Sequence, residues 1–407
     1  MKHKLLKFKP LLINISLVLG SIGFALGVAE IALRILGISY PSFYQVDPYR
    51  GHALIPNMTA RWTHEGNGLV SINAEGLRDR HYEINKPDNT YRIVVLGDSF
   101  SEAIQLDADK TFWSEIEHRL PNCEALAGKT IEVINFGVGD YGTAQAYMTL
   151  KHQALKYQPD LVLLEIFTGN DLVNNSQALS PGDRLSPFWQ EVNGQWQMNM
   201  DFNKSETYRR RDSWARRFVF SLINHSRLLQ VLNEAKRVLV TQRTLTTQNS
   251  EQTDIIPALD FDVNLYQEPA NPEWQQAWAV TESLLTQINQ ASLANQADFV
   301  AVTISNPPQV YPDRQVREKL KQLGAKNLFY PDQRIAKFGQ THGIEVFTLA
   351  PIFQQKADQT GTYWHGFENT IMGTGHWNEK GHQLAGELIG DRLCQRLTQP
   401  SNPTPLK

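Results

Sequence analysis

Five short apolar runs alternate with helical patterns from residue 91 onward, and this alternation restricts the fold more than any other feature. It predicts a parallel sheet with helices on both faces. We expect strands near residues 91–97, 130–136, 160–166, 298–304 and 344–348. Before the fourth strand, Trp274, Trp278, Leu285 and Ile288 recur at helical spacing, which indicates core packing. The predicted fold class is therefore α/β, with a doubly wound, mostly parallel five-stranded sheet.

The first apolar run ends in a sharp Gly-Asp-Ser turn. Residues 93–96 are apolar, and Gly97, Asp98 and Ser99 follow directly. Ligands of open α/β sheets bind beyond the carboxyl ends of the strands, so Ser99 would stand at the mouth of a site. A Ser or Asp in this place is also a common helix N-cap. This segment alone leaves both interpretations open, and we expect Asp98 to stabilise the turn.

Three later segments place polar residues at comparable positions. The second strand runs into a glycine-rich loop that contains Gly139 and Asp140. The third strand ends in Gly169, Asn170 and Asp171, and His376 lies in the segment that opens the last predicted helix. With Ser99, the segments supply Ser, Gly, Asn and His in that order.

This ordered series resembles the four signature blocks of the SGNH (GDSL-type) hydrolase superfamily. The resemblance covers residues 90–175 and 295–397. It implies the flavodoxin-like fold of SGNH hydrolases and a serine hydrolase that acts on ester bonds. The membrane-anchored members that it resembles include esterases and polysaccharide O-acetyltransferases.

The resemblance also implies a role for each residue of the series. Ser99 would be the nucleophile and His376 the base that accepts its proton. The oxyanion hole would consist of the Ser99 N–H, a backbone N–H of the Gly139–Asp140 turn and the Asn170 side chain. A structural alternative stays open for Asn170, which could cap a helix, and for the glycines, which could form tight turns.

Two positions depart from the family pattern. The family often has an aspartate three residues before the histidine, where this chain has Gly373. We expect either a dyad, with a backbone carbonyl orienting His376, or a substitute acid such as Glu368. The glycine block also places Asp140 where one register has glycine, so either Gly139 or the Asp140 main chain could donate. His382 is expected to be structural.

Residues 1–37 are expected to form a cytoplasmic tip and a transmembrane anchor. The stretch Leu11–Ala29 has no charge and is long enough to cross a bilayer as a helix. A lysine cluster precedes it and predicts a cytoplasmic N-terminus: Lys2, Lys4, Lys7 and Lys9. A cleaved signal peptide is the alternative, although its apolar core would be shorter. The prediction is a single-pass protein of the cell membrane with a periplasmic or otherwise extracytoplasmic catalytic domain.

Charge and cysteine content limit the partners and the cofactors. The formal net charge is −3, so nothing favours nucleic acid as a partner. The chain has two cysteines and no Cys/His cluster at metal-ligand spacing, and we predict neither a metal nor a cofactor. Disulfides persist outside the cytoplasm. Cys123 and Cys394 could therefore form a bridge between the first and last helices of the sheet, or remain two thiols.

The remaining chain divides into a lead-in, a catalytic domain and a tail. Residues 38–90 are rich in turn formers and predict a juxtamembrane lead-in of turns and short strands. The SGNH-type domain is expected over residues 91–397, with an insertion at 176–270 beside the site, and residues 398–407 form a flexible tail.

The insertion interrupts the alternation of strands and helices. Its sequence predicts a hairpin over residues 188–198, a long helix over 213–240 and a polar linker over 241–253. It could form a lid or a wall of the binding site. A basic cluster could contact an anionic glycan or lipid headgroups, or could be a solvated surface: Arg209, Arg210, Arg211, Arg216 and Arg217.

The predicted function is an extracytoplasmic serine esterase that cleaves an O-acyl ester, with an O-acetyl ester favoured, through a Ser-His acyl-enzyme. The alternative is an O-acetyltransferase that modifies a cell-envelope or exported polysaccharide. A second alternative is an inactive envelope-assembly protein on the same scaffold, favoured by the missing acid at Gly373. The expected partners are an acylated small molecule or glycan, and the membrane through the N-terminal helix.

Overall fold

The computed structural model describes residues 2–180, 184–245 and 255–398, with side chains described outside residues 2–12 and 240–245. The chain forms two compact units. One groups Met1–Ser42 with Asp212–Gln252, and the other groups Phe43–Arg211 with Thr253–Lys407. Part of the insertion is thus grouped with the N-terminal segment. The domain boundaries expected from the sequence stay a prediction.

The larger unit is built on a parallel sheet of five strands. These are β5 (Thr90–Leu96), β6 (Thr130–Asn135), β7 (Leu161–Ile166), β10 (Asp298–Thr303) and β11 (Glu345–Thr348). Their order is β11-β10-β7-β5-β6, and every pair is parallel. This is the strand order of flavodoxin-like folds. The predicted fold class is confirmed, and each strand lies within two residues of its expected bounds.

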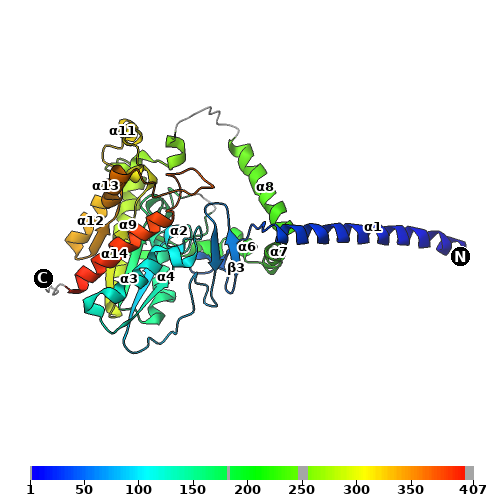
Figure 1. Cartoon of the computed structure of the whole chain (residues 1–407), viewed down its shortest axis with the longest axis horizontal. Helices are drawn as coiled ribbons and strands as arrows, with labels where there is room; N and C mark the ends of the chain where they lie inside the picture. The colour runs from blue at the N-terminus through cyan, green and yellow to red at the C-terminus, as the bar shows by residue number, and fades with distance from the viewer. Residues whose placement is uncertain (1, 181–183, 246–254, 399–407) are drawn as a thin grey trace. The chain divides into compact units, whose positions relative to one another are not determined.

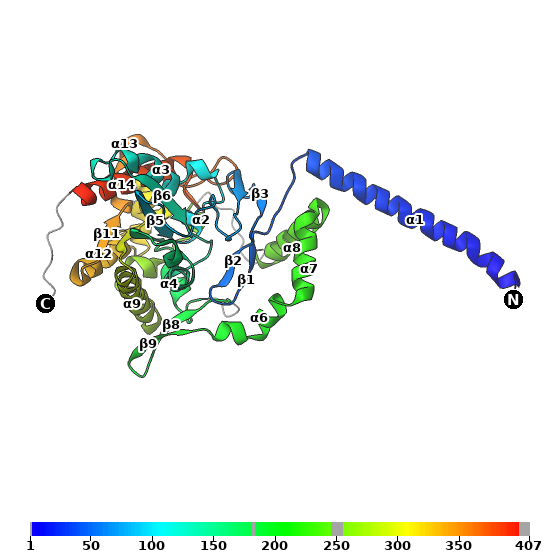
Figure 2. The same cartoon turned by 90° about the horizontal axis from the view of Figure 1, so that it is seen from below.

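Helices cover both faces of this sheet because alternate strand residues point to opposite sides (Figure 2). Val94 and Leu96 belong to one apolar cluster, whereas Ile93 and Val95 belong to the other. The first cluster packs against α4 (Thr143–His152), α9 (Pro272–Ala294) and α12 (Tyr330–His342). The second packs against α3 (Phe112–Arg119), α13 (Ala350–Thr360) and α14 (Glu379–Thr398).

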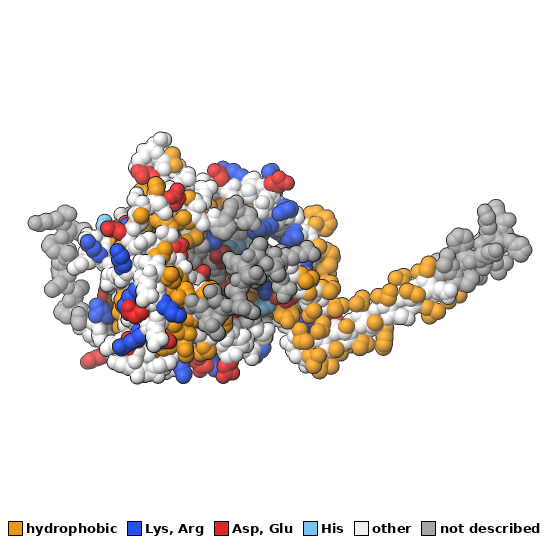
Figure 3. Space-filling model, turned by 90° about the horizontal axis from the view of Figure 1, so that it is seen from above, with side chains coloured by type: hydrophobic (Ala, Val, Ile, Leu, Met, Phe, Trp, Pro, Cys, Tyr) orange, Lys and Arg blue, Asp and Glu red, His pale blue; other side chains and the backbone are white. Residues whose placement is uncertain are grey.

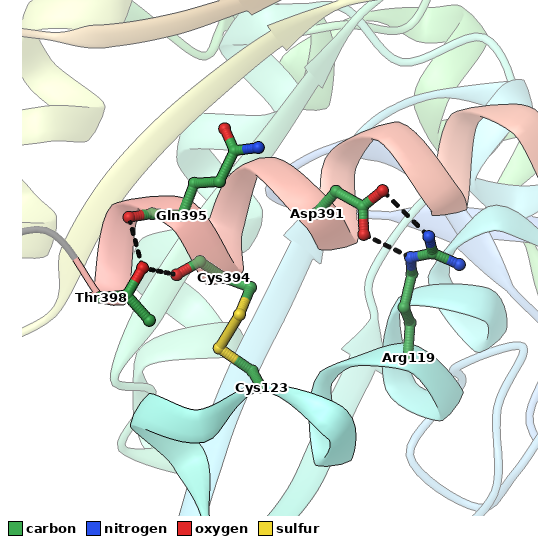
Figure 4. The surroundings of a disulfide bond; sticks show 6 residues. All are labelled: Arg119, Cys123, Asp391, Cys394, Gln395 and Thr398. Atoms are coloured by element: carbon green, nitrogen blue, oxygen red, sulfur yellow. Dashed lines mark hydrogen bonds and ion pairs between the residues drawn. A yellow bond between two sulfur atoms is a disulfide. The ribbon is translucent and has the colours of Figure 1, made fainter.

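A disulfide joins Cys123 to Cys394, with the two Cα atoms 5.6 Å apart (Figure 4). Cys123 follows α3, and Cys394 lies on α14, which packs beside α3 on the same face of the sheet. An ion pair between Arg119 and Asp391, with Nε and Oδ1 2.6 Å apart, lies close to the bridge. Of the two alternatives that the sequence allowed, the structure contains the bridge.

The lead-in forms two short antiparallel hairpins, as expected. They are β1 (Tyr44–Asp47) with β2 (Gly51–Leu54), and β3 (Thr59–Trp62) with β4 (Gly68–Ser71). Buried lead-in residues pack against the loops that follow β5 and β6, in one apolar cluster: Phe43, Leu54, Val70, Ile72, Ile104, Val138 and Tyr141. The lead-in is thereby attached to the carboxyl edge of the sheet.

The insertion contains the expected hairpin, β8 (Phe188–Val192) and β9 (Gln195–Asn199), with Asn193 and Gly194 at positive φ in its turn.

The larger unit also contains short helices: α2 (Ser99–Glu102), α5 (Asp171–Asn175), α6 (Glu206–Arg211), α10 (Pro307–Val310) and α11 (Arg314–Gln322). Its 3-10 helices are η1 (Ala108–Lys110), η2 (Leu120–Asn122), η3 (Glu124–Leu126), η4 (Ala154–Tyr157), η5 (Asp201–Lys204), η6 (Ile256–Leu259) and η7 (Val263–Tyr266).

The smaller unit consists of α1 (Lys2–Ile35), α7 (Trp214–His225) and α8 (Arg227–Leu245) (Figure 1). Within α1, Ile13–Ile35 is long and apolar enough to cross a membrane, with a mean hydropathy of 2.0. Hydrophobic side chains cover this helix in Figure 3.

The prediction of a single helix over residues 213–240 is wrong. The helix is broken at Ser226, which has extended dihedral angles (φ −116°, ψ 118°). The Ser226 hydroxyl and the next two backbone N–H groups donate to the Glu30 carboxylate, which stabilises the break. The predicted linker is helical as far as Leu245, and residues 246–253 of it lie outside the described residues.

Candidate active site

Two strand ends bring Ser99 and Asn170 to the same edge of the sheet. Ser99 begins α2 directly after β5, and Asn170 precedes α5 after β7. The Asp98 carboxylate accepts hydrogen bonds from the Phe100 N–H at 2.9 Å and from Asn170 Nδ2 at 3.0 Å. Asp98 therefore caps α2, as expected, and also orients the Asn170 amide. Among the described residues, the second hydrogen of that amide has no further acceptor.

His376 reaches Ser99 from the loop before α14. Its Nε2 lies 2.8 Å from Ser99 Oγ, although 277 residues separate them in the chain. The next residue, Trp377, is fully buried and donates through Nε1 to Ser305 Oγ at 2.8 Å. The His376 carbonyl accepts from the Gly366 N–H at 2.9 Å. These contacts hold the imidazole against the serine hydroxyl.

The other side of the His376 ring contacts Glu65, a residue of the lead-in. Nδ1 lies 2.6 Å from Glu65 Oε2, and the His376 backbone N–H donates to Glu65 Oε1 at 2.8 Å. With Nδ1 protonated and donating to this carboxylate, Nε2 presents its lone pair to the Ser99 hydroxyl. The sequence predicted either a dyad or Glu368 as the orienting acid, and the structure corrects both. Glu65 is the carboxylate beside His376 Nδ1, and Glu368 is an exposed residue.

Two glycines near His376 lie where side chains would clash with Tyr311 or with the Glu65 carboxylate. A Cβ atom on Gly373, where the family often has aspartate, would lie 2.5 Å from a ring carbon of Tyr311. A Cβ atom on Gly375 would lie 2.3 Å from Glu65 Oε1, so glycine leaves room for this carboxylate. Both residues also have positive φ, which other residues adopt at a cost. The sequence alone did not indicate Glu65, because no pattern in it links this residue to His376.

Asn369 fixes the loop that carries Glu65 between β3 and β4. Its Oδ1 accepts from the Gly66 N–H at 2.9 Å, and its Nδ2 donates to the carbonyls of Thr63 and Gly66, both at 3.0 Å. The Asn67 N–H donates to the Gln105 carbonyl at 3.0 Å. The loop is thus bonded both to the histidine-bearing segment and to the segment that follows Ser99.

The electrostatics of the pair favour a charged Glu65 and a basic His376. Burial disfavours the imidazolium, but the hydrogen bond and the charge of Glu65 outweigh burial, so the pKa of His376 is raised above its ordinary value. Burial also opposes ionisation of Glu65, but the hydrogen bonds and charge of His376 lower the pKa of this carboxyl. Each group therefore stabilises the charged form of the other.

In the glycine loop, the structure distinguishes between the two donors that the sequence left open. The Gly139 N–H donates to Glu102 Oε2 at 2.9 Å and is therefore turned away from a substrate. The prediction of Gly139 as an oxyanion donor is wrong. Asp140 has a φ of +66°, the backbone conformation that favours glycine, as expected where the family has glycine. No acceptor for the Asp140 N–H lies among the described residues.

The Asp140 carboxylate is neutralised by an arginine of the insertion. Arg184 Nη1 lies 3.2 Å from Asp140 Oδ1, and the same guanidinium also donates to the Asp140 carbonyl. This pairing offsets the negative charge of the Asp140 side chain. Arg184 also lines a hollow of about 340 Å³ together with Leu185, Phe188 and Phe202. The insertion therefore contacts the glycine loop.

Other titratable groups near the site have structural contacts. His382 is fully buried, and its Nδ1 accepts from the Phe112 N–H at 3.2 Å. Glu165 accepts from the Asp98 N–H at 3.1 Å and from Ser101 Oγ at 3.0 Å, and burial raises its pKa well above the ordinary value. Among the described residues, no group of three His, Cys, Asp or Glu side chains is arranged to hold a metal ion.

Comparison with known proteins agrees with this geometry. The model of the GDSL-like lipase/acylhydrolase family matches residues 93–389. No curated protein sequence matches the chain.

Several solved structures are similar at low sequence identity. A lipase/acylhydrolase from Enterococcus faecalis is 14% identical, with 76% of this chain and 100% of that chain covered and a TM-score of 0.35. The structure of TesA is 13% identical (74% and 99% covered, TM-score 0.35), and that of the acetyl xylan esterase AlAXEase is 10% identical (75% and 98% covered, TM-score 0.36). On the strength of the family match, this chain belongs to the GDSL-like lipases and acylhydrolases, a family of ester-hydrolysing serine enzymes.

Proposed function

We propose that the chain is a serine esterase whose catalytic triad is Ser99, His376 and Glu65. The observation that supports it is the continuous series of contacts from Ser99 Oγ to His376 Nε2 at 2.8 Å and from His376 Nδ1 to Glu65 Oε2 at 2.6 Å. This order of nucleophile, base and acid is the arrangement that activates serine in unrelated hydrolases. An orienting acid also argues against an inactive scaffold.

In the acylation step, Ser99 Oγ attacks the ester carbonyl carbon while its proton passes to His376 Nε2. The oxyanion is stabilised by the N–H groups of Ser99 and Asp140 and by Asn170 Nδ2. The alcohol leaves with the proton from Nε2. A water molecule then gives a proton to Nε2 and attacks the acyl carbon, which releases the carboxylic acid and restores Ser99.

The substrate and the location belong to the same proposal. An O-acetyl ester of a small molecule or glycan is the substrate that we favour, cleaved outside the cytoplasm by an enzyme anchored through α1. The apolar length of Ile13–Ile35 supports the anchor, and the lysines that precede it support a cytoplasmic N-terminus. The bridge between Cys123 and Cys394 supports an oxidising compartment.

Substitution of Ser99 by alanine tests the proposal most directly. We expect Ser99→Ala to lower kcat for p-nitrophenyl acetate by about 10⁴–10⁶-fold, as removal of a triad nucleophile does. A fluorophosphonate should label Ser99 in the wild-type chain. Ser71→Ala, on the exposed end of β4, is the matched control and should retain full activity.

Analysis of the reaction products distinguishes ester hydrolysis from transfer of the acyl group to a sugar. Product analysis with an added oligosaccharide would reveal acetylated sugar if an alcohol, rather than water, receives the acyl group. Activity of Ser99→Ala within tenfold of the wild type, in a variant that unfolds at the same temperature, would refute both the esterase and the transferase.

A further inference from the structure

Helix α7 has one apolar face that the described residues of its own unit leave uncovered. Trp214, Phe218 and Leu222 are 81%, 58% and 46% exposed. Because they are spaced by four residues, they lie along one side of the helix. A tryptophan with this exposure is unusual for a surface that faces water alone.

The opposite face of α7 is packed inside its own unit. Phe220 and Ile223 are less exposed than the residues of the apolar face. Asn224 forms a reciprocal pair of hydrogen bonds with Ser42: the Ser42 N–H donates to Oδ1 at 3.1 Å, and Nδ2 donates to the Ser42 carbonyl at 3.0 Å. The helix is therefore held in one orientation, with the face of Trp214, Phe218 and Leu222 turned outward.

Hydrogen bonds attach the junction of α7 and α8 to the C-terminal end of α1. The Glu30 carboxylate accepts from Ser226 Oγ at 3.0 Å and from the N–H groups of Arg227 and Leu228 at 3.0 and 2.9 Å. Glu30 thus caps the N-terminus of α8. Arg34 Nη2 donates to the carbonyl of His225, the last residue of α7, at 2.7 Å.

This attachment places α7 where a membrane-spanning α1 would leave the bilayer. Glu30 and Arg34 lie in the last six residues of the apolar stretch Ile13–Ile35. The 12 residues of α7 extend only about 18 Å from the attachment. The helix runs across the direction of α1 in Figure 2, which is the direction of a helix lying along a bilayer surface.

The composition of α7 suits the interface between headgroups and acyl chains. Tryptophan and phenylalanine are preferred residues at this depth. The helix has two arginines, Arg216 and Arg217, of which Arg217 pairs with Asp212 just before the helix, and it has no acidic residue between Trp214 and His225. Arg216 also contacts the Phe220 ring, 5.0 Å from its centre. Basic residues beside an apolar face are attracted to anionic lipid headgroups.

We propose that α7 is an interfacial helix that inserts Trp214, Phe218 and Leu222 into the outer leaflet of the membrane that α1 spans. This inference rests on the anchor in the proposed function. The partner of the apolar face is a lipid surface, and the contact fixes the helical unit at the exit of α1 from the bilayer.

A polarity-sensitive label on α7 tests the contact in the full chain. Phe218→Cys is labelled with a nitrobenzoxadiazole fluorophore, and the protein is reconstituted into vesicles of phosphatidylcholine and phosphatidylglycerol. The two native cysteines are in the disulfide, so the label reacts at the new thiol. We expect blue-shifted emission that nitroxide-labelled lipid quenches more strongly than aqueous iodide does. Gln383→Cys, exposed on α14, is the matched control and should show the reverse.

Two quenching results would overturn the inference. Quenching of the residue 218 label by iodide as strong as in the control would show that the face meets water. Protection from both quenchers would show that protein, such as a second copy of the chain, covers it.

Flotation of the vesicles and hydrolysis of p-nitrophenyl acetate are measured on the same samples. A chain that does not float with the vesicles would overturn the anchor and this inference together. Lipid quenching without hydrolysis would count only against the esterase.

Discussion

The carboxyl edge of the sheet and the lead-in contribute to the active site in different ways. The edge supplies Ser99 and Asn170, each directly after a strand, where the topology of α/β folds places ligand-binding residues. The lead-in supplies Glu65 from a loop between two short strands. The comparison teaches that the fold itself determines where Ser99 and Asn170 lie, because both follow parallel strands. The group proposed to orient the base, Glu65, comes from a segment outside the family match.

The lead-in also contacts the glycine loop. Tyr44 Oη donates to Glu102 Oε2 at 2.8 Å, the same oxygen that accepts from the Gly139 N–H. His52 Nε2 lies 2.8 Å from the Gly139 carbonyl. Because C=O and N–H of one peptide unit point in opposite directions, this contact orients the N–H of Asp140. The lead-in therefore positions parts of both the proposed base and the proposed oxyanion hole.

After the loss of Ser99 itself, the largest effect on kcat is expected from removal of the lead-in carboxylate. Glu65→Gln should lower kcat by about 10³–10⁴-fold, because the neutral amide neither fixes the tautomer of His376 nor stabilises its imidazolium. Steady-state kinetics with p-nitrophenyl acetate measures this loss. Glu368→Gln, the control at the rejected position, should behave as the wild type.

The pH dependence of kcat/KM in Glu65→Gln shows whether the charge of Glu65 acts on His376. His376 must be neutral to accept a proton, and its pKa is raised, so kcat/KM of the wild type should fall as the pH drops through a value above 6.5. Without the charge of Glu65, the pKa of His376 should fall, and this limb should move to lower pH. A purely structural Glu65 would leave the midpoint unchanged.

A smaller effect is expected at the sheet edge. Asn170→Ala should lower kcat by about 10²–10³-fold, with KM little changed, because one donor to the oxyanion is lost. Thermal unfolding checks that removal of the contact with Asp98 leaves the fold intact. An equal loss through KM alone would assign Asn170 to substrate binding instead.

The smallest effect on kcat is expected in the glycine loop, where the lead-in contacts the loop that follows β6. Asp140→Gly keeps the backbone N–H and suits a φ of +66°, so kcat should stay within about threefold of the wild type. The free energy of unfolding should change by no more than about 1 kcal/mol. A loss comparable with that of Asn170→Ala would mean that the Asp140 side chain, held by Arg184, takes part in the reaction.

Much of the larger unit could be predicted because its signals are local. The apolar runs located the strands to within two residues, and parallel strands with a shared carboxyl edge brought Ser99 and Asn170 together. Glu65 lies 311 residues before His376 in a segment without periodicity, so no local pattern linked them. The break at Ser226 was missed for a similar reason, since its partner Glu30 is 196 residues away.

The bridge between Cys123 and Cys394 determines what a break in the insertion would do. Ser99 and Cys123 precede residues 176–270, while Cys394 and His376 follow them. A protease that cuts there would leave the nucleophile and the base on different peptides that are still joined through sulfur. Reduction would then be needed to part them, so the chain can be nicked within residues 176–270 and remain one molecule.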